Sequence, residues 1–216
     1  MTIFEFVTYV TYLIPLALVL LLIYSTLKMP FSSYKIALIG YLTTCLLFYI
    51  GGELLGELKG NNLILIPIFG VLELGWFIFI YYIRIQQKKI FFLIIPTFLC
   101  LIYELITVNF NIPEYFQSYT RFISTLSLFL LTLYYCYFLL RNKWKDYHSS
   151  FFLLNATLLI YSAFSCLYYL PVNLLINGSS ENKFIFWFLN IILTLLFYLI
   201  NTKVLCNIPG KMKIQS

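Results

Sequence analysis

Seven long apolar runs constrain this sequence more than any other feature. Each is close to the ~20 residues that an α-helix needs to cross the ~30 Å hydrocarbon core of a bilayer. They cover residues 6–27, 36–52, 63–83, 90–108, 122–140, 151–170 and 184–201. The runs are apolar on nearly every helical face and do not alternate as the strands of a membrane barrel do. We therefore predict an all-α transmembrane bundle of seven helices, forming one domain over residues 1–216.

The composition excludes most soluble classes of protein. Hydrophobic residues make up 62% of the chain and charged residues 10%, whereas soluble domains carry about 25% charged residues. A chain of 216 residues cannot bury so much apolar surface in one core. A water-soluble enzyme, a disordered chain and a disulfide-stapled secreted module are therefore excluded. The net charge of +6 shows no basic stripe interleaved with aromatic residues, so nucleic acid is not an expected partner.

The distribution of charge predicts an orientation. Lysine and arginine favour the cytoplasmic ends of membrane helices. With the N-terminus outside and the C-terminus in the cytoplasm, eleven of the 14 basic residues lie on the cytoplasmic side. The other three are Lys59, Arg121 and Lys183, so Arg121 is interpreted here as an outer-surface residue. We predict a multi-pass protein of a cell membrane, most simply a bacterial inner membrane.

Five polar residues are candidates for a binding site. Glu73 and Glu104 lie within the third and fourth apolar runs, where an ionisable side chain is costly. At a rise of 1.5 Å per residue, Glu73 is ~15 Å and Glu104 ~9 Å below the predicted outer edge. Glu53 and Glu57 follow the second run and share one helical face, and Asn190 lies in the seventh run. Together they predict an outward-opening pocket for a cation, a polar headgroup or protons.

A structural interpretation of the same acidic residues remains open. Glu53 and Glu57 would then be solvated at the membrane surface, while Glu73 and Glu104 would bond neighbouring helices. Gly70 and Gly75 flank Glu73 in the sequence. Because small residues let membrane helices approach closely, these glycines predict a tight helix crossing beside Glu73.

The residues that are missing exclude several known chemistries. The one histidine, His148, lies in a loop between apolar runs, so a histidine-rich zinc site and a serine–histidine catalytic set are not available. The five cysteines include no C-x-x-C pair. No lysine lies in the middle of the last run, which excludes a retinal Schiff base. We expect no metal, no cofactor and no catalytic set of these types.

Part of the chain resembles a group of small bacterial seven-helix membrane proteins of unknown function. Residues 61–82 begin with two asparagines, carry Glu73 in the middle of a helix and end with two tyrosines. Residues 155–162 and Asn190 are similar to the same group, whereas Ala163 stands where the group leads us to expect glycine. The resemblance implies a seven-helix fold and no particular chemistry. Size, hydropathy and residue bias also resemble membrane accessory proteins encoded beside type VI CRISPR nucleases.

Three functions remain open at this point. We favour a non-enzymatic sensor or regulatory module that acts through a protein partner bound at the cytoplasmic loop 141–150 or at the C-terminal tail. A cation- or proton-conducting transporter, or an oligomeric pore, would use Glu73 and Glu104. An intramembrane lipid hydrolase would use the same two carboxyl groups as acid and base. The lipid bilayer is an expected partner in each case.

Overall fold

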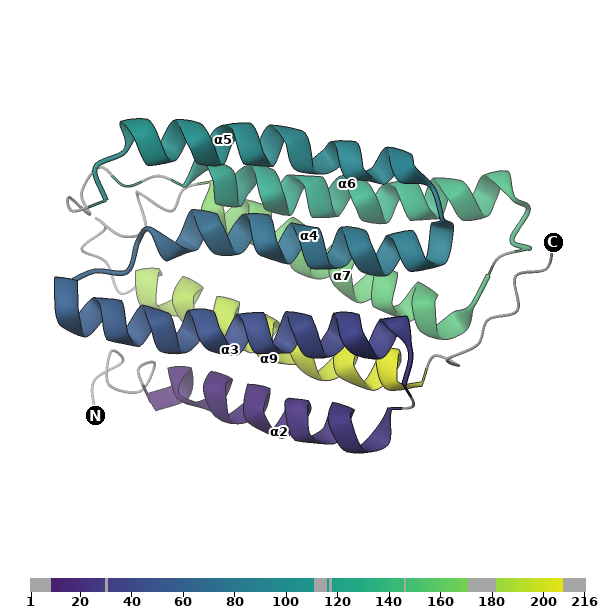
Figure 1. The fold of residues 1–216 in the computed structure, drawn as a ribbon, viewed down its shortest axis with the longest axis horizontal. Coiled ribbons are helices and arrows are strands. Elements are labelled where there is room, and N and C mark those ends of the chain that lie inside the picture. The colour runs from purple at the N-terminus through teal and green to yellow at the C-terminus, as the bar shows by residue number, and fades with distance from the viewer. Residues whose placement is uncertain are drawn as a thin grey trace.

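The computed structural model describes residues 9–29, 31–110, 116, 118–145, 147–170 and 182–207, with backbone alone for residues 182–184. Within these residues, seven helices are long and apolar enough to cross a membrane. They contain α2 (Leu13–Lys28), in a span that begins at Tyr9, α3 (Ser33–Lys59), α4 (Leu65–Ile85), α5 (Ile94–Thr107) preceded by the 3₁₀ helix η1 (Lys88–Leu93), α6 (Tyr119–Arg141), α7 (Ser149–Tyr169) and α9 (Asn182–Cys206) (Figure 1). The prediction of an all-α seven-helix bundle is confirmed. The C-terminal tail beyond residue 207, and residue 146 of the loop 141–150, lie outside the described residues.

The sequence sets the helix ends by familiar local devices. The side chains of Ser32 and Ser118 accept hydrogen bonds from the backbone N–H groups of Lys35 and Arg121, each at 3.2 Å, and so cap α3 and α6. Gly60 ends α3 with a φ of 76°, in the left-handed region that glycine adopts without strain. Proline is the third residue of three helices, where no intrahelical hydrogen bond is lost: Pro15, Pro67 and Pro96.

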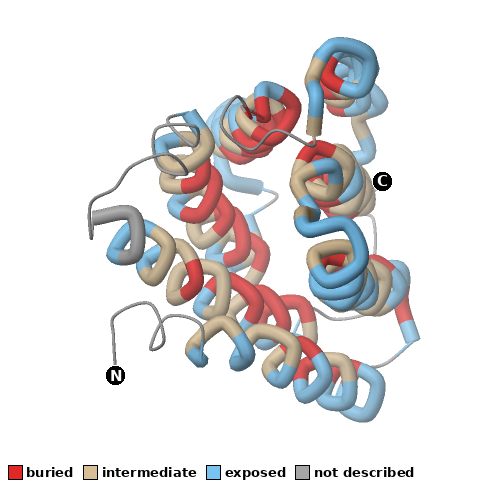
Figure 2. The backbone as a smooth tube through the Cα atoms, turned by 90° about the vertical axis from the view of Figure 1, so that its left-hand side faces the viewer, coloured by how far each residue is buried: buried red, intermediate tan, exposed pale blue. Residues whose placement is uncertain are grey.

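Six of the helices form a ring. The contacts run from α2 to α3, then to α4, α6, α7 and α9, and from α9 back to α2. α5 lies outside this ring and packs against α4 and α6 (Figure 1). The inward-facing positions are buried, while the outer positions are exposed (Figure 2). The interior of the ring is therefore the place where a polar site can be kept from lipid.

The outer surface of the bundle is strongly apolar. Large apolar side chains with more than 60% of their surface exposed include Leu27, Leu47, Ile106, Ile160 and Leu167, which come from four different helices. A water-soluble protein does not expose so continuous an apolar surface. Hydrocarbon removes this cost, and helices satisfy their backbone hydrogen bonds internally. The chain is a multi-pass integral membrane protein.

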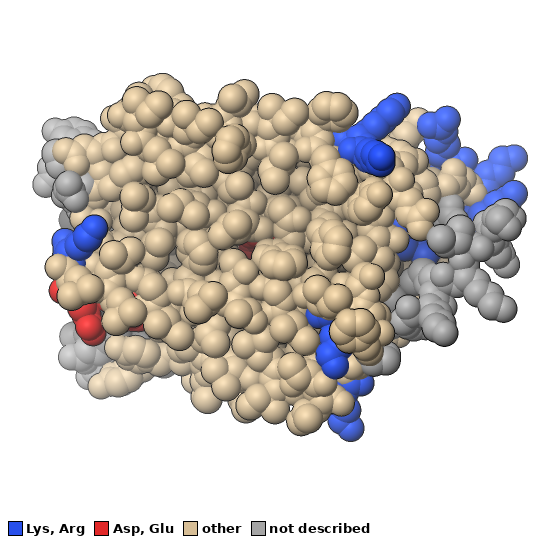
Figure 3. All heavy atoms as spheres, in the orientation of Figure 1, with Lys and Arg blue, Asp and Glu red and all other residues tan. Residues whose placement is uncertain are grey.

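The two ends of the bundle differ in charge. Lysine and arginine gather at one end, and the acidic side chains of Glu53 and Glu57 lie with Lys59 at the other (Figure 3). We call these the basic end and the acidic end. The described residues of the basic end are Lys28, Lys35, Arg84, Lys88, Lys89, Arg141, Lys143, Lys145 and Lys203. This asymmetry is the one that predicts the basic end to be cytoplasmic, and the orientation itself remains a prediction.

Aromatic side chains fill the ring toward the basic end. Tyr81, Tyr135 and Phe151 are fully buried, and their ring centroids lie 5.0–5.9 Å from one another. Phe77, one helical turn before Tyr81, is also buried. We call these four residues the aromatic cluster. Rings at these separations gain packing energy beyond the area they bury, so this half of the bundle is tightly closed.

Candidate functional site

A buried ion pair joins α4 to α6. One carboxylate oxygen of Glu73, Oε2, lies 2.6 Å from Nη1 of Arg121. The two side chains are 0% and 2% exposed, respectively. A charge buried in a bilayer protein needs a partner, because the cost of leaving it alone is several kcal/mol. Each of these two residues supplies the charge that the other requires.

Two tyrosines complete the coordination of Glu73. The hydroxyls of Tyr41 in α3 and Tyr161 in α7 each donate a hydrogen bond of 3.1 Å to its other oxygen, Oε1. The Tyr161 hydroxyl also accepts a hydrogen bond of 3.3 Å from Nη2 of Arg121. A single carboxylate therefore ties α3, α4, α6 and α7 together in the middle of the ring.

Gly70 makes room for this arrangement. It lies one turn before Glu73 on the same face of α4, the face over which the Glu73 side chain leans. A Cβ atom at Gly70 would meet Oγ of Ser124 at 2.8 Å, Cδ of Arg121 at 3.2 Å and Cα of Arg121 at 3.4 Å. The tight helix crossing predicted beside Glu73 is thus present at Gly70. At Gly75 the nearest atom would be Cδ1 of Ile94, at 4.0 Å.

Aromatic rings enclose the charged pair. The guanidinium carbon of Arg121 lies 4.9 Å from the ring centroid of Phe69 and 5.0 Å from that of Tyr169. Such cation–π contacts stabilise a cation that has been removed from water. The Tyr161 ring stacks on Phe197 of α9 at 4.0 Å with an interplanar angle of 8°. The tyrosine that bonds both charges is therefore held in place by a fifth helix.

A cavity of about 270 Å³ lies beside this pair, in the half of the ring toward the acidic end. Each of the six helices of the ring contributes residues to the cavity wall, whereas α5 contributes none. Seven of the lining residues are aromatic. The wall is formed by Thr11, Ile14, Leu18, Cys45, Phe48, Tyr49, Gly52, Asn62, Leu65, Ile66, Phe69, Arg121, Tyr161, Tyr169, Trp187, Asn190, Ile191, Thr194 and Tyr198.

The charge in the cavity wall is positive. Arg121 is the one charged residue among the described residues that line the cavity, whereas Glu73 lies behind it. Asn190, a predicted site residue, lines the same cavity. The wall extends to Cys45 and Tyr198, and the Tyr198 ring lies 6.0 Å from that of Tyr41. Tyr41 in turn packs against Phe77 of the aromatic cluster, at 5.0 Å.

Glu104 has a separate role in the structure. It is 1% exposed, and its Oε1 accepts a hydrogen bond of 2.7 Å from the backbone N–H of Thr120, in the first turn of α6. The first N–H groups of a helix lack partners within the helix, and a negative charge there also interacts favourably with the helix dipole. Glu104 thus bonds a neighbouring helix, as its structural interpretation predicts.

The four glutamates do not form one pocket. Glu53 and Glu57 are exposed on the last turns of α3, which continues beyond the apolar run 36–52 to Lys59. Glu73 and Glu104 bond different residues of α6, and no hydrogen bond joins the two carboxyl groups in the described part of the chain. The acidic pocket expected from the sequence is replaced by a cavity with an arginine in its wall.

Arg121 is the residue that sequence reasoning missed. It immediately precedes the apolar run 122–140, a position that predicts an outer-surface charge, yet it is buried. Two signals could have identified it. A cation in the first turn of a helix opposes the helix dipole and therefore needs a compensating partner. Glu73, buried within the third run, likewise needs a cation.

Comparison with protein-family models, with curated proteins and with solved structures finds no match. Among the residues that the structure describes, no three histidine, cysteine, aspartate or glutamate side chains gather as metal ligands. The function must therefore be inferred from the cavity and the ion pair themselves.

Proposed function

We propose that this protein is a membrane-embedded sensor that binds a small molecule in the cavity and transmits the binding event to the basic end of the bundle. One observation carries the proposal: Arg121 belongs both to the cavity wall and to the buried ion pair with Glu73. A ligand that touches Arg121 changes the strength of the bond between α4 and α6. Ligand binding and helix packing are thereby coupled, as a sensor requires.

The route to the basic end consists of packed side chains. Phe77 and Tyr81 follow Glu73 along α4, and the Tyr81 hydroxyl donates a hydrogen bond of 2.7 Å to Oδ1 of Asn155 in α7. Tyr81 also packs against Tyr135 of α6. A small displacement of α4 against α6 near the cavity therefore reaches α7 and the basic end through rigid contacts.

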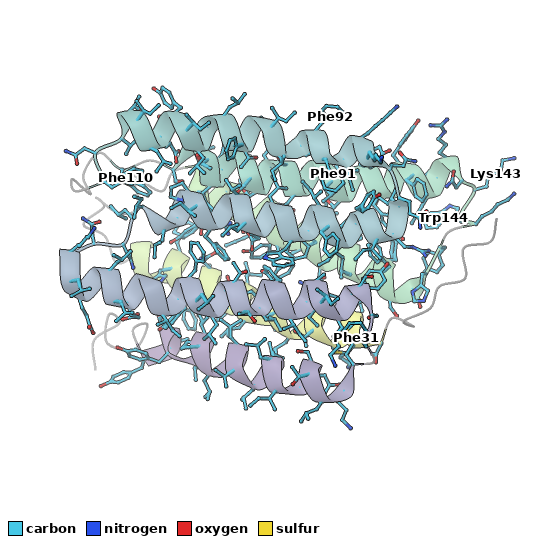
Figure 4. All side chains as sticks on the ribbon, viewed as in Figure 1. Phe31, Phe91, Phe92, Phe110, Lys143 and Trp144 are labelled. Carbon is cyan, nitrogen blue, oxygen red and sulfur yellow. The ribbon has the colours of Figure 1, made fainter. Side chains whose placement is uncertain are left out.

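The basic end offers a surface for a partner. Trp144 and Lys143 follow α6 in left-handed conformations, with φ of 61° and 51°, and Trp144 is 49% exposed (Figure 4). Its ring packs against Tyr147 at 5.7 Å and Phe152 at 6.2 Å. An exposed aromatic residue among lysines and arginines favours a protein partner with an acidic surface. In the proposal this end faces the cytoplasm of a bacterial cell.

The aromatic cluster is the reason for preferring a sensor to a transporter. It fills the ring between the cavity and the basic end, so the cavity does not continue through the bundle. A transporter would have to open this packed region in each cycle. We therefore expect reconstituted liposomes to show no cation or proton flux that depends on Glu73.

Distances between spin labels at the basic end test the proposal. Leu27→Cys in α2 and Leu140→Cys in α6 place nitroxides at exposed positions, in a background without the native cysteines. Glu73→Gln should change the distance distribution, because it breaks the ion pair far from both labels. The matched control, Glu57→Gln, removes an exposed carboxylate and should leave the distribution unchanged. An unaltered distribution in Glu73→Gln, or a proton flux that this variant abolishes, would overturn the sensor proposal.

A further inference from the structure

Apart from the ion-paired atoms, two polar atoms of cavity-lining residues have no hydrogen-bond partner among the described residues: Nε of Arg121 and the hydroxyl of Tyr49, both of which can donate. Both oxygens of Glu73 are occupied, one by Arg121 and the other by the hydroxyls of Tyr41 and Tyr161. Arg121 is 2% exposed and lines the cavity, but its Nε has no hydrogen-bond partner in the structure. A guanidinium carries five N–H donors and no acceptor. The cavity wall therefore lacks a hydrogen-bond acceptor for Arg121.

From this imbalance we infer that the cavity takes the anionic head of a small amphiphile, bound by Arg121. The inference rests on the proposed function, whose ligand it specifies. A carboxylate or phosphate supplies the missing acceptor and makes charge-assisted bonds to a guanidinium. The aromatic wall, with Phe48, Phe69 and Trp187, provides an apolar surface for the body of the molecule. A volume of about 270 Å³ is near the lower end of the range for small-molecule sites.

The ligand's anionic group competes with Glu73. Both are anions that seek the same guanidinium, so a bound carboxylate weakens the bond between Glu73 and Arg121. Glu73 then retains the hydroxyls of Tyr41 and Tyr161, which hold it on the side of α3 and α7. Ligand binding therefore replaces the Glu73–Arg121 bond between α4 and α6 with a bond between the ligand and Arg121 of α6. This exchange gives the sensor two states that differ in a single ion pair.

Two sources could provide such an anionic group. One is a free single-chain amphiphile, small enough to be held in a cavity of about 270 Å³. The other is the headgroup of an anionic membrane lipid, whose chains would remain in the bilayer. The chemistry at Arg121 is the same in both, and the lipid composition used in the binding assay distinguishes them.

Equilibrium binding of radiolabelled octanoate to the protein in phosphatidylcholine nanodiscs tests the inference. Octyltrimethylammonium and 1-octanol serve as cationic and neutral competitors of the same chain length, and empty nanodiscs measure partition into lipid. The wild-type protein should bind octanoate, and the cationic competitor should not displace it. Glu73→Gln should bind octanoate about tenfold more tightly, because it removes the competing carboxylate.

A double variant distinguishes a loss of octanoate binding from a loss of folding. Arg121→Met alone buries an unpaired Glu73, whereas Glu73→Gln with Arg121→Met removes both charges at once. The double variant should lose octanoate binding by about tenfold or more relative to wild type. Lys59→Met is the matched control, since it removes an exposed positive charge at the same end of the bundle and should leave octanoate binding unchanged.

The outcomes separate the inference from the proposed function. Displacement of octanoate by the cationic competitor, or weaker octanoate binding in Glu73→Gln, would overturn the inference. If 1-octanol binds equally to wild type and to the double variant while octanoate does not bind, the inference of an anion site would be overturned. The proposed function, a sensor that binds a small molecule, would still stand. No binding of any probe, together with unaltered spin-label distances, would overturn both. Octanoate binding that phosphatidylglycerol suppresses would support the anion site and identify a lipid headgroup as its source.

Discussion

The carboxylate of Glu104 accepts a hydrogen bond of 2.7 Å from the backbone N–H of Thr120, so an acidic residue of α5 caps the first turn of α6. Ser118 caps the same turn from within, through its bond to the N–H of Arg121. These two contacts fix the start of α6. Because Arg121 is in that turn, they also fix the position from which its side chain reaches Glu73.

Removing the Glu104 cap should destabilise the bundle. Glu104→Ala leaves the buried N–H of Thr120 without an acceptor and should lower the free energy of unfolding by about 1–3 kcal/mol. Glu104→Gln retains an acceptor oxygen and should cost less. SDS titration in mixed micelles measures both variants. Equal stability of Glu104→Ala and wild type would contradict a capping role.

Gly70 and Gly75 offer a matched pair of substitutions on one helix. Gly70→Ala places a methyl group against Ser124 and the backbone of Arg121, and overpacking of this kind costs about 1–3 kcal/mol. Gly75→Ala meets no atom closer than 4.0 Å, so it should be neutral or stabilise α4 by up to about 1 kcal/mol. Relative to wild type, the free energy of unfolding should therefore fall in Gly70→Ala and stay unchanged or rise in Gly75→Ala. Similar losses in both would show that α4 and α6 do not cross closely at Gly70.

His148 makes the stability of the basic end dependent on pH. Its partial burial, and then the positive charge of Arg84, lower the pKa of His148 from its ordinary value of 6.5. The unfolded chain therefore binds the proton more readily, and stability should fall as the pH drops from about 6.5 through the lower pKa of the folded state. His148→Gln should remove this part of the pH dependence. A histidine titration midpoint above 6.5 in the folded protein would contradict the assignment.

The orientation of the bundle can be measured by labelling. Single cysteines in place of Lys59 and Lys143, in a background without the native cysteines, mark the acidic and basic ends. A membrane-impermeant maleimide added to intact cells should label the Lys59→Cys variant and not the Lys143→Cys variant, because basic residues favour the cytoplasm. Labelling of Lys143→Cys alone would reverse the predicted orientation.

The fold could be predicted because hydrocarbon imposes a length on each apolar helix. The ends of the helices could be predicted less well, since a helix need not end where the hydrocarbon does. α3 continues past Glu53 and Glu57 to Lys59, where Gly60 provides the left-handed residue that ends it. The 3₁₀ turn of η1 before α5 also leaves no clear mark in the sequence, because its last four residues, 90–93, are as apolar as those of the helix that follows.

The site could be predicted only in part. The sequence points to Glu73 because an ionisable residue is costly in hydrocarbon, but that cost does not show which residue pairs with it. Its partner Arg121 is distant in sequence and lies at the edge of an apolar run, where a charge is ordinarily solvated. Asn190 does line the cavity, but its relation to Arg121 depends on the order of the helices around the ring. That order is a property of tertiary packing.

A double-mutant cycle on Glu73 and Arg121 measures the strength of the ion pair on which both the sensor and its anionic ligand depend. Glu73→Gln and Arg121→Met should each lower the free energy of unfolding by about 3–5 kcal/mol, since each leaves a buried charge unpaired. The double variant should be more stable than the sum of the single losses predicts, by about 2–3 kcal/mol. Losses that add to within about 0.5 kcal/mol would show that the two residues do not interact, and would contradict the account.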